Sequence, residues 1–176
     1  MAGGTPLVVS SQAKVLRGLT YVVDPARLSQ PVLRPVLDYW ERKRDGQALP
    51  RRGDIDPFEL KPYLRHLFLI EVLPDEQFRY RLVGSEITER YGRNSTGKTV
   101  HEIYAAQPGV GQWVTQMLLA VARSARPVLA SGPLTAVNKE HILSESLHLP
   151  LADEGDRVGM IFGAARYTRV SPHRGV

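Results

Sequence analysis

The sequence contains no cysteine in its 176 residues. This absence excludes disulfide bonds, thiolate metal sites and a cysteine nucleophile. The chain also lacks any apolar run near the roughly 20 residues that a membrane-spanning helix needs. Its first residues lack the charged start of a secretory signal, and the apolar stretch Leu7–Val9 is too short for a signal core. We therefore expect a cytoplasmic protein that does not bind a membrane.

The motifs of common catalytic and metal sites are also missing. The five histidines form none of the i, i+4 pairs of a helical zinc site, and no G-x-S-x-G turn occurs. Ser144, Ser146 and His148 do alternate along one predicted strand, as a nucleophile and a base could. A working triad, however, needs a third, orienting group and an oxyanion site. We predict no metal site, no catalytic residue and no enzymatic activity.

The composition is that of an ordinary globular domain. Hydrophobic residues make up 43% and charged residues 23% of the chain, and the length is that of one domain. The net charge of +5 raises nucleic acid as a partner. The densest basic groups, residues 42–44 and 51–52, lie at the end of a predicted helix and in the loop after it, where cations complement the helix dipole. We predict no nucleic-acid binding. A basic nucleic-acid-binding domain remains an alternative, and its affinity would fall steeply with salt.

The phosphate-binding loop pattern G-x-x-x-x-G-K-[ST] matches Gly92–Thr99. Such a loop must follow a buried strand and open a long helix, because the helix N-terminus attracts the anion. Ile87 and Tyr91 instead show helical spacing before the loop, and Pro108 stops any helix soon after it. We interpret Gly92 as the left-handed end of a short helix. A P-loop nucleotide-binding enzyme using this stretch remains the alternative.

An amphipathic helix is predicted over residues 31–46. Its apolar residues recur on a 3.6-residue period with charged residues opposite, and Gly46 ends it. The apolar face packs either on the chain's own core or on a partner, and the pattern does not decide between them. We predict a homodimer formed through residues 31–44. Residues 1–29 show no sustained period, so we expect a loosely ordered arm, although residues 21–23 could form a short strand.

The rest of the chain predicts two strands, three helices and three strands. The strands are expected at 67–73, 78–83, 127–137, 142–150 and 157–167, and the helices at 85–91, 100–106 and 110–124. Strands joined by turns this short must be antiparallel neighbours. The sequence therefore predicts an α+β fold with a five-stranded antiparallel sheet and helices on one face, preceded by the amphipathic helix. One domain is expected over residues 30–170, followed by a tail at 171–176.

Several motifs carry a resemblance to a known family. They are L-R-P-V-L-D-Y-W at 33–40, F-R-Y-R-L-V-G at 78–84, G-R-N-S-T-G at 92–97, and L-H-L-P-L at 147–151 followed by 157–164. Together with the order of elements, they resemble the PAS family, and short stand-alone bacterial PAS proteins in particular. The resemblance covers residues 31–168 and implies a PAS-like sheet. It also implies a sensory or regulatory module without enzymatic activity.

A PAS domain is expected to hold a small molecule between its inner sheet face and its helices, to dimerise, or to dock on a signalling protein such as a histidine kinase. This chain has no room for an attached output domain, so we expect it to act in trans. Covalent flavin photochemistry uses a cysteine, which is absent. Haem would need an axial histidine, for which His101 is the only candidate in the helical region. We therefore assign no cofactor.

The predicted ligand-binding residues come from both layers of this fold. They are the strand residues Tyr80, Leu82, Ser146 and His148 and the helix residues Ile87, Tyr91 and Trp113. A pocket needs apolar walls with a few polar anchors, and Tyr80, Tyr91, Ser146 and His148 would be the anchors. The same spacing is also what an ordinary filled core requires, so core packing remains the alternative.

Overall fold

The computed structural model describes residues 18–170. It contains one six-stranded sheet in the order β1-β4-β5-β6-β2-β3, and all neighbouring strands are antiparallel. The strands are β1 Thr20–Val22, β2 Leu67–Leu73, β3 Gln77–Val83, β4 Val128–Leu134, β5 Lys139–Ala152 and β6 Val158–Arg169. The helices are α1 Arg34–Arg44, α2 Ser85–Tyr91, α3 Val100–Ile103 and α4 Pro108–Ser124. The predicted α+β fold with an antiparallel sheet is confirmed, with element ends a few residues from those expected.

The sheet has one strand more than the five predicted. β1 adds to the edge of β4, with Thr20 opposite Ser131 and Val22 opposite Leu129. Residues 1–17 of the predicted arm, and residues 171–176 of the predicted tail, lie outside the described residues. Where the described remainder of the arm meets the domain, Glu145 accepts hydrogen bonds from the backbone N–H groups of Ser29 at 2.9 Å and Gln30 at 2.8 Å. The sequence allowed a short strand at residues 21–23, but a three-residue strand is too short to show a period that would place it in the sheet.

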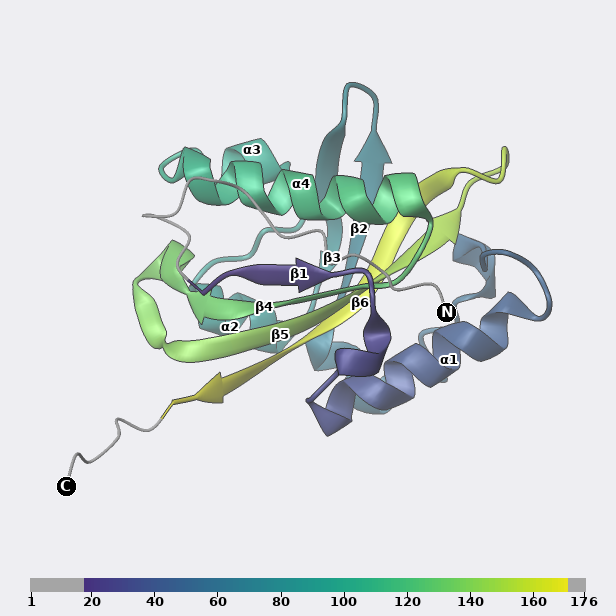
Figure 1. Ribbon diagram of the computed structural model, residues 1–176, viewed down its shortest axis with the longest axis horizontal. Helices are drawn as coiled ribbons and strands as arrows, with labels where there is room; N and C mark the ends of the chain where they lie inside the picture. Colours follow the sequence, from purple (N-terminus) through teal and green to yellow (C-terminus); the bar gives the residue numbers. More distant parts are fainter. Residues whose placement is uncertain (1–17, 171–176) are drawn as a thin grey trace, which may run out of the picture.

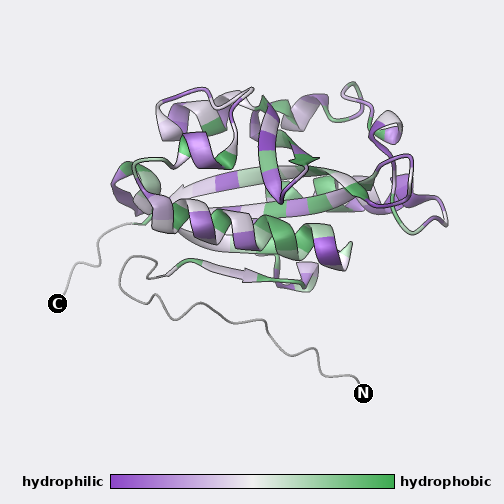
Figure 2. Cartoon of the chain, turned by 90° about the horizontal axis from the view of Figure 1, so that it is seen from above, coloured by the Kyte–Doolittle hydropathy of each residue, from purple (hydrophilic) through white to green (hydrophobic). Residues whose placement is uncertain are grey.

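Helices lie on both faces of the sheet, because the N-terminal helix α1 packs on the face opposite α3 and α4 (Figure 1). α3 and α4 lie on one side, which we call the inner face, and α1 lies on the other (Figure 1). Successive side chains of a strand point to opposite faces, so Ser146 and His148 of β5 face α4 while Leu147 and Leu149 face α1. Figure 2 shows apolar and polar residues interleaved along the strands and helices, as expected of elements with a buried side.

The apolar face of α1 is covered by the chain's own sheet. Short 3-10 turns lead into this helix at Pro31–Leu33, and Asp45 ends it in the left-handed conformation at φ 42°. Leu33, Val36 and Trp40 are at most 1% exposed. The Trp40 indole Nε1 donates a hydrogen bond to the carbonyl oxygen of Pro150 in β5 at 2.9 Å. Packing on the chain's own core therefore accounts for the apolar face of this amphipathic helix, and the predicted dimer through residues 31–44 stays a prediction that this face does not support.

The segment Gly92–Thr99 connects α2 to α3 beside the edge strand β3. Gly92 ends α2 with φ 68°, as predicted. The Gly97 N–H donates to the Tyr80 carbonyl at 2.7 Å, and the Lys98 carbonyl accepts from the Tyr80 N–H at 3.0 Å. Thr99 caps α3, a helix of only four residues. The Gly97 N–H is bonded to a strand, and the N–H groups of Thr96 and Lys98 are bonded within the segment, so this geometry does not fit a phosphate-binding loop.

Candidate ligand cavity

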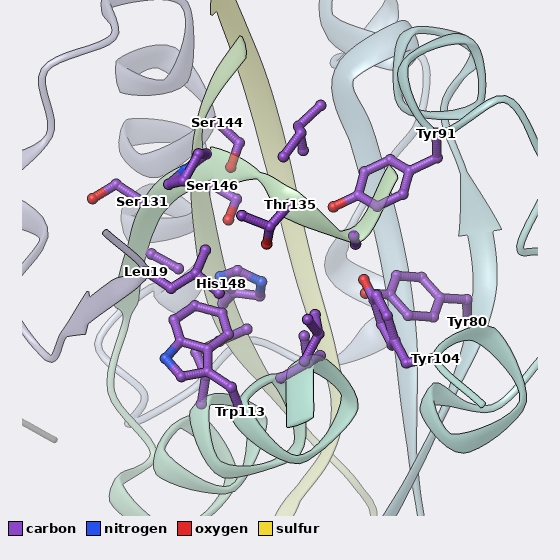
Figure 3. A pocket seen from close by; sticks show the side chains of 17 residues that line it. Leu19, Tyr80, Tyr91, Tyr104, Trp113, Ser131, Thr135, Ser144, Ser146 and His148 are labelled. Carbon is purple, nitrogen blue, oxygen red and sulfur yellow. The ribbon is translucent and has the colours of Figure 1, made fainter. Parts of the chain in front are cut away.

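Two adjoining cavities lie between the inner face of the sheet and helices α2–α4. Their volumes are about 90 Å³ and about 70 Å³. Both are lined by the same five polar residues, Tyr80, Tyr91, Tyr104, Ser146 and His148. Figure 3 shows the larger one. These shared residues make the two spaces parts of one candidate site.

Three tyrosines form one wall of the cavity. Tyr80 comes from β3, Tyr91 from the last turn of α2 and Tyr104 from the end of α3. Their hydroxyl groups point toward one another and toward the open space in Figure 3. Burial raises the pKa of all three phenols, so each stays a neutral hydroxyl at physiological pH. Each can therefore donate one hydrogen bond and accept others.

His148 stands on the sheet wall opposite the tyrosines. Its side chain is buried, with 4% of the residue exposed, and no hydrogen-bond partner of Nδ1 is found among the described residues. Burial lowers the pKa of His148 to about 4, while hydrogen bonding to the backbone of Val128 and Ser146 opposes that shift, so the imidazole is neutral at physiological pH. A buried polar atom without a partner costs free energy and calls for an explanation. An absent molecule that hydrogen-bonds Nδ1 is one such explanation.

A glycine makes room for the ring of His148. Gly163 of β6 lies opposite His148 in the sheet, and the Phe68 ring packs over it with its centroid 5.0 Å from that of the imidazole. A Cβ on Gly163 would stand 2.4 Å from a Phe68 ring carbon and 2.1 Å from the Leu147 carbonyl oxygen. The missing side chain thus lets two aromatic rings meet on the cavity floor.

The remaining wall of the larger cavity is mostly apolar, apart from Ser131, Thr135 and Ser144. It includes Trp113, Val114 and Met117 of α4 and Leu134 at the end of β4. The N-terminal segment closes this end, because Leu19 lines the cavity and Tyr21 of β1 packs edge-on against Trp113 at 5.7 Å between ring centroids. The site therefore has a polar end at the tyrosines and His148 and an apolar end at Trp113.

Six of the seven predicted ligand-binding residues line the cavities. Tyr80, Tyr91, Trp113, Ser146 and His148 border the larger one, and Ile87 borders the smaller one. Whether they bind a ligand stays a prediction.

The seventh residue, Leu82, does not line either cavity. A β-bulge at Arg81 pairs Leu82 with Leu69 but Tyr80 with the next residue, Ile70. Cross-strand partners share a face and neighbours in a strand do not, so the bulge places Leu82 on the face opposite Tyr80. Leu82 is 45% exposed there.

Several cavity residues were not predicted. Among them are Tyr104, Phe68, Ser144 and Met117. Met117 could have been found, since it shares the helical face of Trp113. Tyr104 could also have been found, since it lies in the helix predicted at 100–106 and shares the helical spacing of Val100 and Ile103.

No metal or cofactor site stands out in the described part of the chain. Among residues 18–170, no group of three or more histidine, aspartate or glutamate residues could hold a metal ion. His101, the candidate haem ligand, is exposed and lines neither cavity. The cavities are also well below the roughly 300–1,000 Å³ of sites for drug-sized ligands. These residues therefore do not fit haem. No helix among residues 18–170 has the length and apolar character required to cross a membrane.

A buried carboxylate lies behind the site. Glu86 of α2 is 1% exposed and receives an ion pair from Arg166 of β6 at 3.0 Å, and its Oε2 lies 2.5 Å from Nδ1 of His66. Burial lowers the pKa of His66, and the nearby Glu86 carboxylate opposes that shift. Arg65 stands farther off at 3.8 Å. This cluster joins α2 to the sheet and to the turn before β2.

Comparisons with known proteins agree with this architecture. A family model described as a PAS domain matches residues 28–166. A search of curated proteins finds no match.

Two solved structures are similar to the chain. One is an RNA-binding light-oxygen-voltage receptor, 13% identical, with a TM-score of 0.43 over 66% of this chain and 35% of that one. The other is a sensory box histidine kinase from Vibrio cholerae, 14% identical, with a TM-score of 0.45 over 65% of this chain and 90% of that one. The matched region thus spans about a third of the first structure.

Proposed function

This chain belongs to the PAS domain family, and from that premise we propose that it binds a small molecule in the cavity between its inner sheet face and helices α2–α4. It is a sensory PAS module. We further propose that it has no enzymatic activity, resides in the cytoplasm and passes its signal to a separate protein such as a histidine kinase. The sensor domain would extend over residues 30–170 together with β1, which closes one end of the cavity.

This proposal rests mainly on one observation, the buried Nδ1 atom of His148. Its Nδ1 is buried without a partner among residues 18–170, and the space beside it is bordered by three tyrosines. Native proteins pair nearly all such buried groups with protein or ordered water. A ligand with a hydrogen-bonding group would pair this nitrogen while filling the apolar end near Trp113.

A homodimer remains part of the proposal, but its interface cannot be the apolar face of α1. That face is buried on the sheet, with Trp40 1% exposed. The exposed apolar side chains elsewhere include Phe58, Leu64, Leu82 and Leu143. A dimer would have to use surface of this kind.

The proposal predicts that small molecules stabilise the protein through this cavity. Thermal unfolding against a library of metabolites should yield compounds that raise Tm by roughly 5–10 °C at about 100 times their Kd. The variant Ser146→Phe, which places a ring in the space shared by both cavities, should abolish the shift. The matched control Leu143→Phe, at a position on the same strand that is 45% exposed, should keep it.

Compounds that raise Tm equally in wild type and in Ser146→Phe would bind elsewhere and would refute the cavity as the sensory site. Because the added ring overpacks the core at a cost of about 1–3 kcal/mol, each shift is measured against the ligand-free Tm of the same variant.

A further inference from the structure

The size, charge and polarity of the cavity narrow the chemical class of its ligand. We propose that it selects an uncharged molecule of the size of one aromatic ring, with a hydroxyl-type group at one end. This inference rests on the proposed function and says which ligands the site would take. Size, charge and polar groups each contribute to it.

The volume sets the size. The two adjoining spaces measure about 90 Å³ and about 70 Å³. An apolar protein cavity of about 150 Å³ holds benzene. A single six-membered ring with a small substituent therefore matches the space, and a fused-ring cofactor would exceed it.

The lining sets the charge. Among residues 18–170, no charged side chain borders the larger cavity, and only Arg93 borders the smaller one. The Arg93 guanidinium keeps its charge and uses one N–H, on Nη2, to donate a hydrogen bond to the Ile103 carbonyl oxygen at 2.7 Å. Burying an unpaired charge is costly. A cation would find no carboxylate among the described lining residues, and in the larger cavity an anion would find only neutral hydroxyls and a neutral imidazole.

The polar end sets the functional group. Tyr80, Tyr91 and Tyr104 are neutral hydroxyls that can each donate a hydrogen bond. The Nδ1 of His148 is buried beside them without a partner among residues 18–170. A ligand hydroxyl both donates and accepts, so one group can satisfy the imidazole and a tyrosine together.

The apolar end suits a ring. Trp113 presents its indole to the larger cavity, which Met117 and Leu134 also line, and Phe68 lines the smaller one (Figure 3). Aromatic pairs gain about 0.5–1.5 kcal/mol beyond burial when they pack edge-on or offset. A ligand with a ring at this end and a hydroxyl at the other would match the apolar and polar ends of the cavity.

Three single-ring probes of similar size and different charge test the inference. Phenol, benzoate and benzylamine are titrated into the full chain by isothermal calorimetry at neutral pH. We expect phenol to bind at least about tenfold more tightly than either charged probe, since one unmade buried interaction is worth about that factor. His148→Leu should weaken phenol binding by about tenfold, and Ser146→Phe should abolish it.

Each other outcome overturns the inference in a distinguishable way. Tighter binding of benzoate or benzylamine, lost in Ser146→Phe, would overturn the ligand class but leave the cavity as the sensory site. Phenol binding that survives Ser146→Phe would overturn both proposals. If none of the probes binds, the proposed ligand class is overturned. Whether the cavity binds another small molecule is then tested by the thermal-unfolding screen of metabolites. If His148→Leu fails to fold, the ring proton NMR signals of His148 must move when phenol is added to wild type, and unmoved signals would overturn the inference.

Discussion

Trp40→Ala is expected to destabilise the protein by about 3–5 kcal/mol, the usual cost of truncating a buried tryptophan. Trp40 is 1% exposed, and its indole N–H is bonded to the Pro150 carbonyl of β5. Alanine leaves both a cavity under α1 and a buried carbonyl without its donor, and the two costs add. The free energy of unfolding from urea titration measures the change.

Phe58→Ala is the matched control for this loss. It removes another aromatic ring close to α1 in sequence, but Phe58 is 87% exposed, so the expected change is within about 0.5 kcal/mol. If the apolar face of α1 were a partner surface, Trp40→Ala would change the oligomeric mass and leave the stability of the monomer nearly intact. That result would contradict the packing described above.

The stability of the protein should fall by about 3 kcal/mol between about pH 7.5 and pH 4 through His148 alone. Its pKa is about 4 in the folded protein against an ordinary value of 6.5. Between these two values the unfolded chain binds the proton and the folded protein does not, so acid favours the unfolded state. The contribution is fully present above the unfolded pKa and is lost as the pH falls toward 4.

Other groups also make the protein less stable at low pH. The contribution of His148 must therefore be measured as the difference between wild type and a variant that lacks this histidine. The pKa of His66 is also lowered by burial, and hydrogen bonds from Thr99 lower the pKa of Glu102. Urea unfolding across this pH range should therefore give a clearly flatter curve for His148→Gln than for wild type. His101→Gln, which removes an exposed histidine, should follow wild type. Parallel curves for wild type and His148→Gln would show that His148 is not held neutral.

The sequence predicted those features that depend on local pattern and connection length. Alternating strands joined by short turns leave antiparallel pairing as the only arrangement, and the ends of α2 and α4 follow from Gly92 and from the apolar spacing around Trp113. The same spacing also placed six of the seven predicted ligand-binding residues on the cavities, because a residue on the inner face of a strand or helix must border whatever fills the core.

The sequence predictions failed where the structure depends on contacts between residues that are far apart in the chain. The period of α1 reveals an apolar face but not its cover, which is the far side of β5. The bulge at Arg81 places Leu82 on the opposite face of the sheet from Tyr80, and the sequence of β3 does not predict this bulge. A motif match at Gly92–Thr99 likewise says nothing about the hydrogen bonds that this segment makes with Tyr80.

Native mass spectrometry tests the central claim most directly. The full chain, of 19.6 kDa, is incubated with a small-molecule cell extract and sprayed intact. A small-molecule adduct should appear on wild type and on Leu143→Phe and be missing from Ser146→Phe. Wild type that emerges at the mass of its own chain, or an adduct retained by Ser146→Phe, would contradict a ligand held between the sheet and helices α2–α4.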